Sequence, residues 1–325
     1  MGSELGSLIA TLLEKERWTG EITGLDIDPP RRRLRSATFH RVEPRDRRKM
    51  VRIVRDFDPH VVVHAAVWEP NARAHPGDAA EWTHSAAIGV LGAAAECPSL
   101  EHVVVRSGIS VYGRRRGTVD EGAPCERTGD GYTDTKIAAE QLVFERQRAG
   151  RLRCSVVRPC IVYGPYDWKF VPRVAEGLEG GRVPLIAGGA HRAPIVGVSD
   201  VADLVVECAL QPSAVGEAFN CASTEVVSWK RLFEEIAQLL GARVPRWSVP
   251  FRVAYGAGAV LEAVYRLAGS ATPPVITRFA AEVLGTAVEY DMSKAERLLG
   301  WRPRVTIGVG LPETIAWLQA ERARA

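Results

Sequence analysis

The apolar positions of this chain fall into short runs separated by longer segments with helical spacing. Valine-rich runs occupy residues 61–67, 103–106 and 153–159, and their β-branched residues are typical of buried strands. The segments 83–96 and 132–148, which lie between or after these runs, predict helices. At 325 residues, the chain is long enough for one large α/β domain or two unequal lobes.

The two ends of the chain also predict helices. Apolar residues at helical spacing in 1–18 predict an opening helix, and a short strand over 20–28 follows it. Residues 166–194 are rich in glycine and predict irregular structure. From Val227 onward the chain is mostly helical, with Ser228 as an N-cap. Asp200 and Asp203, at the start of an earlier helix, are interpreted first as capping residues.

One apolar segment of the C-terminal part, 250–269, leaves several interpretations open. Arg252, Glu262 and Arg266 interrupt it, so it is not uniformly apolar. It could pack in the core, which is the general case, cover a hydrophobic substrate, or contact a membrane surface.

Composition indicates a soluble protein of the cytoplasm. The apolar share is 46% and the net charge is +3, which predicts no strong attraction to nucleic acid or to anionic membranes. No stretch is long and apolar enough for an integral membrane segment, and the start lacks the pattern of a signal peptide. The six cysteines form no C-x-x-C pair, so we expect free thiols in a reducing compartment and no metal site.

Candidate chemistry lies between Val103 and Lys136. The strand that ends at Arg106 is followed by Ser107, Ser110 and Tyr112, and parallel strands usually carry their chemistry at this carboxyl end. Further on, Tyr132 and Lys136 are four residues apart and so share one helix face. An ammonium beside a phenol favours the phenolate, which can then transfer a proton near neutral pH. By spacing alone, an exposed helix pair is an equal alternative.

The order of these segments resembles a known family. The chain contains a strand, then SGISVYG, then an acidic loop, then YTDTKIAAEQL. This order resembles that of the extended short-chain dehydrogenase/reductase superfamily, and within it the NAD-dependent epimerase/dehydratase family. This resemblance implies a doubly wound parallel α/β sheet with an interleaved, smaller, mostly helical substrate lobe. It implies that Tyr132 and Lys136 are catalytic. The family's usual catalytic Ser or Thr position is Gly108 here, so Ser107 or Ser110 is the candidate replacement, and Gly108→Ser is expected to raise activity if a side chain fits.

The resemblance also implies residues that bind a dinucleotide. NAD is the expected cofactor, because Asp26 follows the second strand, where an acid binds the ribose hydroxyls and repels a 2′-phosphate. Arg31, Arg32 and Arg33 keep NADP as the alternative. The strand that opens the fold in the family has no counterpart before Gly2. The other implied cofactor residues are Gly2, Ser3, Gly6, Ala65, Ala66, Lys136, Pro159 and Tyr163.

The C-terminal half is most similar to the 3β-hydroxysteroid and sterol dehydrogenases, through TPPVITR (272–278) and YDMSKAERLLGWRP (290–303). The resemblance implies a dinucleotide-binding domain in 1–165 and 194–222 and a substrate lobe in 166–193 and 223–325. The expected activity is hydride transfer between nicotinamide and a secondary alcohol or ketone of a small molecule, either sterol-like or a nucleotide sugar. The resemblance is also compatible with a homodimer. The alternative is a catalytically impaired dinucleotide-binding or scaffold protein.

Overall fold

The main sheet of the protein is four-stranded and entirely parallel. The computed structural model describes residues 1–43, 46–65, 88–128, 131–167, 170–267 and 277–324. The sheet has the order β10–β6–β4–β3. Its strands are β3 (Val61–His64), β4 (His102–Arg106), β6 (Cys154–Pro159) and β10 (Ala218–Cys221). The valine-rich runs of the sequence are therefore strands, as predicted.

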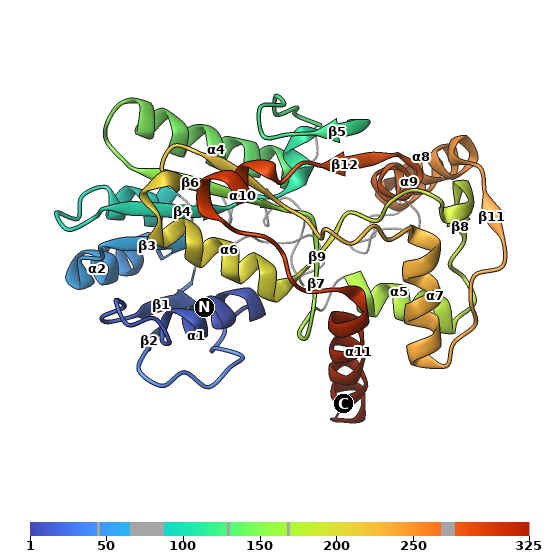
Figure 1. Cartoon of the computed structure of the whole chain (residues 1–325), viewed down its shortest axis with the longest axis horizontal. Coiled ribbons are helices and arrows are strands. Elements are labelled where there is room, and N and C mark those ends of the chain that lie inside the picture. Colours follow the sequence, from blue (N-terminus) through green and yellow to red (C-terminus); the bar gives the residue numbers. More distant parts are fainter. Residues whose placement is uncertain (44–45, 66–87, 129–130, 168–169, 268–276, 325) are drawn as a thin grey trace.

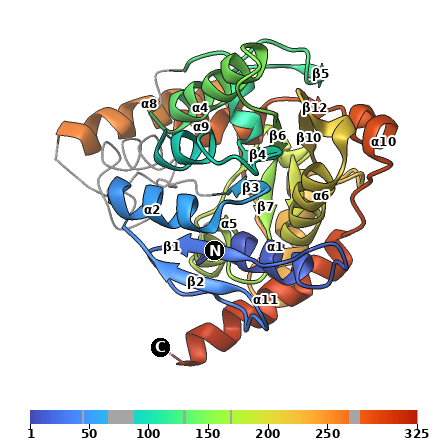
Figure 2. The same ribbon diagram turned by 90° about the vertical axis from the view of Figure 1, so that its left-hand side faces the viewer.

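Helices cover both faces of this sheet. Val103 and Val105 of β4 pack against helix α4 (Gly131–Arg148) and the helical residues 88–94. Val104, between them, points to the opposite face, since successive strand residues alternate. There it joins a cluster with α1 (Glu4–Leu13) and α6 (Val198–Leu210). Figures 1 and 2 show this arrangement, which confirms the predicted doubly wound α/β fold.

Two further strands form a separate parallel pair beside α1. They are β1 (Thr23–Asp26) and β2 (Thr38–Arg41), and helix α2 (Arg47–Phe57) follows them. Among the described residues, no strand is hydrogen-bonded between β1 and β3. The amino terminus lies at this gap, because the Met1 ammonium forms an ion pair with Asp26 at 2.9 Å. The described part of the sheet is thus divided at this point.

A second group of elements lies on the right of Figure 1. Trp229, Phe233 and Leu311 belong to its hydrophobic core, which is separate from the clusters around the main sheet. The helices of this group are α5 (Phe170–Glu179), α7 (Trp229–Leu240), α8 (Phe251–Leu267), α9 (Arg278–Gly285) and α11 (Ile307–Arg324). Helix α10 (Ser293–Leu299) lies instead beside the main sheet.

Three short parallel strand pairs accompany these helices. They are β7 (Ile161–Tyr163) with β9 (Ile195–Gly197), β5 (Gly117–Val119) with β12 (Val288–Tyr290), and β8 (Leu185–Ile186) with β11 (Ser248–Val249). Ala295, Leu299 and Trp301 pack with α6 beside the main sheet. The lobe boundaries read from the sequence remain a prediction.

The prediction of irregular structure over 166–194 is wrong, because α5 lies within it. Val171, Ala175 and Leu178 are buried on one side of this helix at spacings of three and four. The Asp167 carboxylate accepts hydrogen bonds from the first backbone N–H groups of α5. Pro172 occupies the first turn, where its missing N–H would have no helical partner.

The capping interpretation of Asp200 and Asp203 is right only in part, because Asp200 lies in the first turn of α6, where an acid complements the helix dipole, but neither side chain caps the helix. The N-cap of α6 is Gly197, which has no side chain to accept a bond. Instead, the Asp200 carboxylate accepts hydrogen bonds from the backbone N–H groups of Arg304 and Val305, at 2.8 and 3.1 Å. Asp203 accepts one from the Trp301 indole at 3.0 Å. Both acids therefore hold the C-terminal segment against α6. By contrast, the predicted N-cap Ser228 is confirmed, since it accepts a bond from Arg231 N–H.

Two buried histidines make the stability of this fold depend on pH. Burial lowers the pKa of His64 and of His102 to about 4, and a nearby cation, the amino terminus or Arg153, adds to each shift. The unfolded chain protonates these groups near pH 6.5, so stability is lost as the pH falls from there toward 4. Lowering the pH from 6.5 to 5 should cost roughly 2 kcal/mol for each histidine.

We expect His102→Gln to remove about 2 kcal/mol of this pH dependence, measured by urea unfolding at pH 7 and pH 5. Replacement of His60, which is exposed, is the matched control, because it leaves both buried histidines in place. A pH dependence unchanged by His102→Gln would contradict the explanation.

Candidate functional site

The candidate catalytic residues lie at the carboxyl ends of β4 and β6. Because these neighbouring strands are parallel, their ends meet at one edge of the sheet. Ser107 follows β4, and Pro159 is the last residue of β6. Helix α4 carries Lys136 to the same edge, where its side chain is only 6% exposed.

Lys136 lies directly against the backbone of Gly108. A Cβ atom added to Gly108 would lie 2.8 Å from Lys136 Nζ and 3.5 Å from the Pro159 carbonyl oxygen. The φ angle of Gly108 is 174°, an extended conformation that any residue adopts. The short distance to Lys136, and not the backbone conformation, therefore explains why this residue is a glycine. A serine here requires the Lys136 ammonium, the end of a flexible side chain, to move, and the effect of Gly108→Ser on activity stays a prediction.

Two serine hydroxyls flank this contact. Ser107 is 1% exposed, and the side-chain oxygens of Ser107 and Ser110 are buried without a hydrogen-bond partner in the described part of the chain. Buried hydroxyls usually have a partner, so these two could donate to a bound substrate oxygen. Tyr132 lies in the first turn of α4 by its backbone, and its side chain lies outside the described residues.

The predicted nucleotide-binding residues surround the start of α1. Ser3 is the N-cap of this helix and accepts a hydrogen bond from Gly6 N–H at 3.1 Å. A Cβ on Gly6 would lie 2.9 Å from Met1 Cα, so the close approach of the chain requires glycine there. Gly2 N–H and the Met1 ammonium both donate to one oxygen of Asp26, at 2.7 and 2.9 Å.

Arg32, one of the three arginines that could bind a 2′-phosphate, already has a carboxylate partner. Its guanidinium donates two hydrogen bonds to Glu4, at 2.5 and 2.8 Å. Burial raises the pKa of Glu4, although Arg32 opposes that shift. Arg31 contributes its backbone N–H to Ser7. A phosphate would thus have to compete with Glu4 for Arg32.

The remaining predicted cofactor residues lie in different surroundings. Ala65 follows β3 and is partly buried, whereas Ala66 lies outside the described residues. The ring of Tyr163 is buried in the core of the C-terminal group of helices, and a Cβ on Gly310 would lie 2.8 Å from it. Its hydroxyl has no partner in the described part of the chain. Any cofactor contact from Tyr163 would therefore have to come from its backbone.

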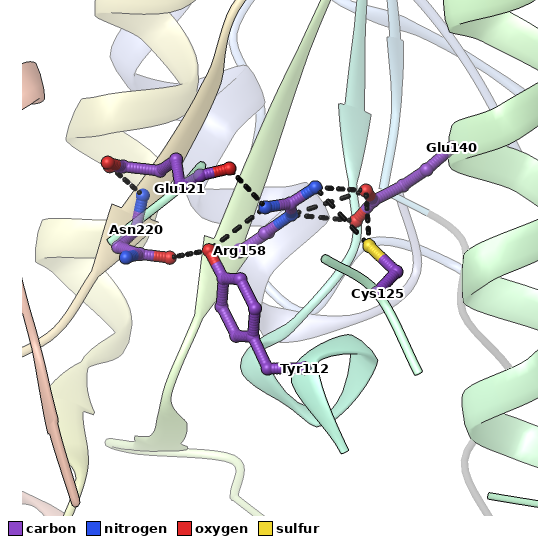
Figure 3. Close-up of polar contacts among 6 residues, drawn as sticks. All are labelled: Tyr112, Glu121, Cys125, Glu140, Arg158 and Asn220. Atoms are coloured by element: carbon purple, nitrogen blue, oxygen red, sulfur yellow. Dashed lines mark hydrogen bonds and ion pairs between the residues drawn. The ribbon is translucent and has the colours of Figure 1, made fainter. Parts of the chain in front are cut away.

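A buried polar network adjoins Lys136, and Figure 3 shows its members. Arg158 of β6 and Glu140 of α4, 5% and 3% exposed, form an ion pair at 2.6 Å. Arg158 also donates to the Tyr112 hydroxyl at 2.9 Å, and that hydroxyl donates to Asn220 of β10 at 2.6 Å. Burial alone would lower the pKa of Arg158, but Glu140 outweighs it and raises the value.

Two loop residues complete this network. Glu121 accepts from Asn220 N–H with its side chain and from Arg158 with its carbonyl, at 2.8 and 3.4 Å. Cys125 accepts a weak hydrogen bond from Arg158 at 3.6 Å. The network therefore joins α4, β6, β10 and the loop before α4.

This network was not predicted from the sequence, although the sequence contains two signals of it. Glu140 lies four residues after Lys136, on the same face of α4. Arg158 is a charged residue in a strand whose six positions are all buried. A buried charge requires a partner of opposite sign, so the pair could have been expected. Burial raises the pKa of Tyr112 as well, and its hydroxyl is bonded to both Arg158 and Asn220, which makes it part of this framework.

These residues are compatible with a bound dinucleotide. The N-terminus of α1 offers backbone N–H groups of the kind that bind pyrophosphate. Asp26 is 26% exposed, and a carboxylate can accept about four hydrogen bonds, so ribose hydroxyls could join its three present donors. Lys136 lies at the carboxyl end of β4, the edge of a parallel sheet at which nucleotides generally bind.

Solved structures of known enzymes share this fold. UDP-glucose 4-epimerase of Thermotoga maritima, solved with UDP-glucose, is 19% identical with a TM-score of 0.75, and the match covers 99% of this chain and 97% of that one. For dTDP-glucose 4,6-dehydratase of Streptomyces venezuelae, solved with NAD, the values are 21%, 0.72, 99% and 96%. At these identities the similarity establishes the fold alone.

Relatives with higher sequence identity identify the family. A 2-alkyl-3-oxoalkanoate reductase of Stenotrophomonas maltophilia is 30% identical over 272 residues, which cover 78% of this chain and 82% of the reductase. A mouse sterol-4-alpha-carboxylate 3-dehydrogenase is 25% identical over 57% of this chain and 54% of its own length. The sequence profile of the NAD dependent epimerase/dehydratase family matches residues 4–222. The chain belongs to the NAD-dependent epimerase/dehydratase family.

Proposed function

We propose that this protein is a NAD-dependent oxidoreductase that interconverts a secondary alcohol and a ketone on a largely apolar small molecule. The observation that carries the proposal is the buried ammonium of Lys136 at the carboxyl end of β4, beside Gly108. Bound NAD would supply the hydride chemistry. Tyr132 would transfer the hydroxyl proton, and Lys136 would favour the phenolate of Tyr132 and hold the ribose.

Ser107 and Ser110 would orient the substrate oxygen in place of the hydroxyl that Gly108 lacks. Both have buried hydroxyls with unused donors in the described residues. Lys136 fills the space beside Gly108, so the donor nearest to that position is a cation rather than a hydroxyl. Such a donor stabilises negative charge that develops on a carbonyl oxygen.

The sequence relatives favour a reductase or dehydrogenase over a nucleotide-sugar enzyme. Relatives at 25–30% identity include a 2-alkyl-3-oxoalkanoate reductase and sterol dehydrogenases. The nucleotide-sugar epimerases and dehydratases are structural neighbours at about 20% identity. A panel of 3-oxoalkanoates, 3-oxosteroids and nucleotide sugars, assayed by NADH consumption or formation, distinguishes the two classes. Turnover of none of them would favour the non-catalytic, dinucleotide-binding alternative.

We also propose NAD rather than NADP and a cytoplasmic location. Asp26 supports NAD, and the ion pair of Arg32 with Glu4 weakens the case for a 2′-phosphate site. All six cysteines are free and five are buried, which suits a reducing compartment. The homodimer allowed by the family resemblance is a further proposal, to be tested by light scattering.

The first test concerns Lys136 and its neighbour. Lys136→Met and Tyr132→Phe should each lower kcat by about 10² or more, since they remove the proton-transfer groups. Gly108→Ala should lower it by a comparable factor, because its Cβ displaces the ammonium and small displacements at a site can cost about 10². Gly20→Ala is the control, as no atom lies within 4 Å of a Cβ there. Full activity of Gly108→Ala would show that the contact with Lys136 is irrelevant.

A second test concerns cofactor choice. Asp26→Ala should reduce the preference for NADH over NADPH about tenfold, roughly 1.4 kcal/mol, because the acid no longer repels the 2′-phosphate. The exposed neighbour Asp28→Ala should leave the ratio unchanged. Dissociation constants for both nucleotides, measured by calorimetry, give the result. Tighter binding of NADPH by the unaltered chain would assign the dominant role to Arg31, Arg32 and Arg33.

A third test concerns the ion pair of Glu140 and Arg158. Glu140→Gln should lower the free energy of unfolding by about 3–5 kcal/mol, since it leaves a buried guanidinium without its counter-ion. Replacing both residues, with Glu140→Leu and Arg158→Met, should cost less than Glu140→Gln alone. The control is Glu217→Gln, which breaks a half-exposed pair with Lys294 and should cost less than about 1 kcal/mol. Equal losses for the two Gln variants would refute the argument.

A further inference from the structure

Helix α8 is apolar on two opposite sides, and only one of them is packed. On its inner side, Ala254 is 1% exposed and lies in a small core with Ile186 and Ala281. A Cβ on Gly258 would lie 2.8 Å from the backbone nitrogen of Arg278, so α8 and α9 are in close contact there. Glu262 accepts from the Arg278 guanidinium at 2.7 Å, which neutralises the single acid of the helix.

The outer side of α8 is a continuous apolar stripe on the surface. Four of its side chains are large and well exposed: Val253 at 59%, Val260 at 63%, Val264 at 52% and Leu267 at 89%. Small residues fill the positions between them, and the complete stripe is Val253, Gly256, Ala257, Val260, Ala263, Val264 and Leu267. Spacings of three and four place all of them on one face. A contiguous exposed stripe of this kind marks an interaction surface.

The segment that leads into α8 is basic. Between Glu235 and Glu262 the sequence contains no acidic residue, whereas Arg243, Arg246 and Arg252 are all exposed. Arg252 lies in the first turn of α8, next to the stripe. Trp247, 50% exposed, precedes the helix. The net charge of +3 for the whole chain conceals this local excess of positive charge.

We propose that this protein binds the surface of an anionic membrane, with the outer stripe of α8 inserted into the boundary between headgroups and acyl chains. A helix with an apolar outer face, flanking arginines and an exposed tryptophan has the composition of helices that lie in that plane. Arginines near an anionic bilayer add electrostatic attraction. None of the helices in the described ranges is long and apolar enough to cross the bilayer, which agrees with binding at the surface.

A second copy of the chain is the less suitable occupant. Stable protein interfaces bury about 1,200–2,000 Å² in total and usually have aromatic anchors. The stripe offers four aliphatic side chains and three positions occupied by glycine or alanine. That surface is small for a dimer by itself, and a lipid phase requires no complementary shape.

The stripe is also linked to the candidate site. Arg114, next to Gly113 at the end of the Ser107–Tyr112 segment, donates to the Tyr255 hydroxyl of α8 at 2.7 Å and pairs with Glu282 of α9 at 2.7 Å. Membrane contact through α8 would therefore hold this side of the site close to the lipid. The proposal does not depend on the enzymatic activity, since it concerns binding alone.

Co-sedimentation of the full chain with phosphatidylcholine vesicles, with and without phosphatidylserine, tests this proposal. We expect binding to be about tenfold or more stronger with phosphatidylserine. Val260→Glu and Val264→Glu should each weaken it about tenfold, whereas Val260→Trp should preserve or strengthen it. Val309→Glu is the matched control, because Val309 is 58% exposed on α11 and lies outside the stripe. Arg246→Gln with Arg252→Gln should remove most of the preference for phosphatidylserine.

Circular dichroism and thermal unfolding verify that each variant is folded. We expect the variants to fold, because Val260 and Val264 are exposed. Absence of vesicle binding by the unaltered chain would overturn the proposal, as would an equal loss in Val309→Glu. Light scattering detects the rival occupant. A dimer that Val260→Glu converts into a monomer, with no binding to vesicles, would assign the stripe to a second copy of the chain.

Discussion

The geometry of the candidate site depends on one buried ion pair, between Glu140 of α4 and Arg158 of β6. Neither charge is tolerated alone in the interior, so the helix and the strand are held in the one register that brings the two groups together. Lys136 is one helical turn before Glu140 on the same face. Fixing Glu140 therefore also fixes where the Lys136 ammonium meets the end of the sheet.

The same pair couples the site to the rest of the sheet edge. Arg158 reaches Tyr112, whose hydroxyl reaches Asn220 on β10, and the side chain of Glu121 accepts from Asn220 N–H. Segments more than 100 residues apart in sequence thus meet in one network, shown in Figure 3. The Tyr of the V-Y-G segment belongs to this framework, since its hydroxyl is fully engaged. Its neighbours Ser107 and Ser110, in contrast, keep buried hydroxyls without partners in the described residues.

The parts of the fold that depend on local sequence could be predicted, and the parts that depend on distant contacts could not. Valine runs identified three of the four strands of the main sheet, β3, β4 and β6, and helical spacing identified α1, α4 and α7. Asp200 was misread because its partners, the N–H groups of Arg304 and Val305, lie 104 and 105 residues away. Helix α5 was missed because its glycine-rich surroundings suggested a loop. Its N-terminal acceptor Asp167 and its buried face become evident only in the folded chain.

Gly108 shows a similar limit within the site. From sequence it is an absent hydroxyl, and its replacement by serine would restore the family pattern. In the structure the same position is a contact with Lys136, in which a side chain and the ammonium would compete for one space. The same glycine therefore has two interpretations, which predict opposite effects of Gly108→Ser on activity. The turnover of variants at position 108 distinguishes them.

Helix α8 shows why apolar character by itself does not assign a role. The sequence left core packing, substrate cover and membrane contact open, because apolar residues extend around most of the helix and its three charged residues do not indicate which apolar side is packed. Packing of Ala254 and Gly258 against α9 assigns one side to the core. That contact necessarily turns Val253, Val260 and Val264 outward, since they lie on the opposite side of the same helix. The exposed stripe is therefore a consequence of how α8 meets α9, and the basic segment that leads into α8 is what favours a membrane as the proposed partner.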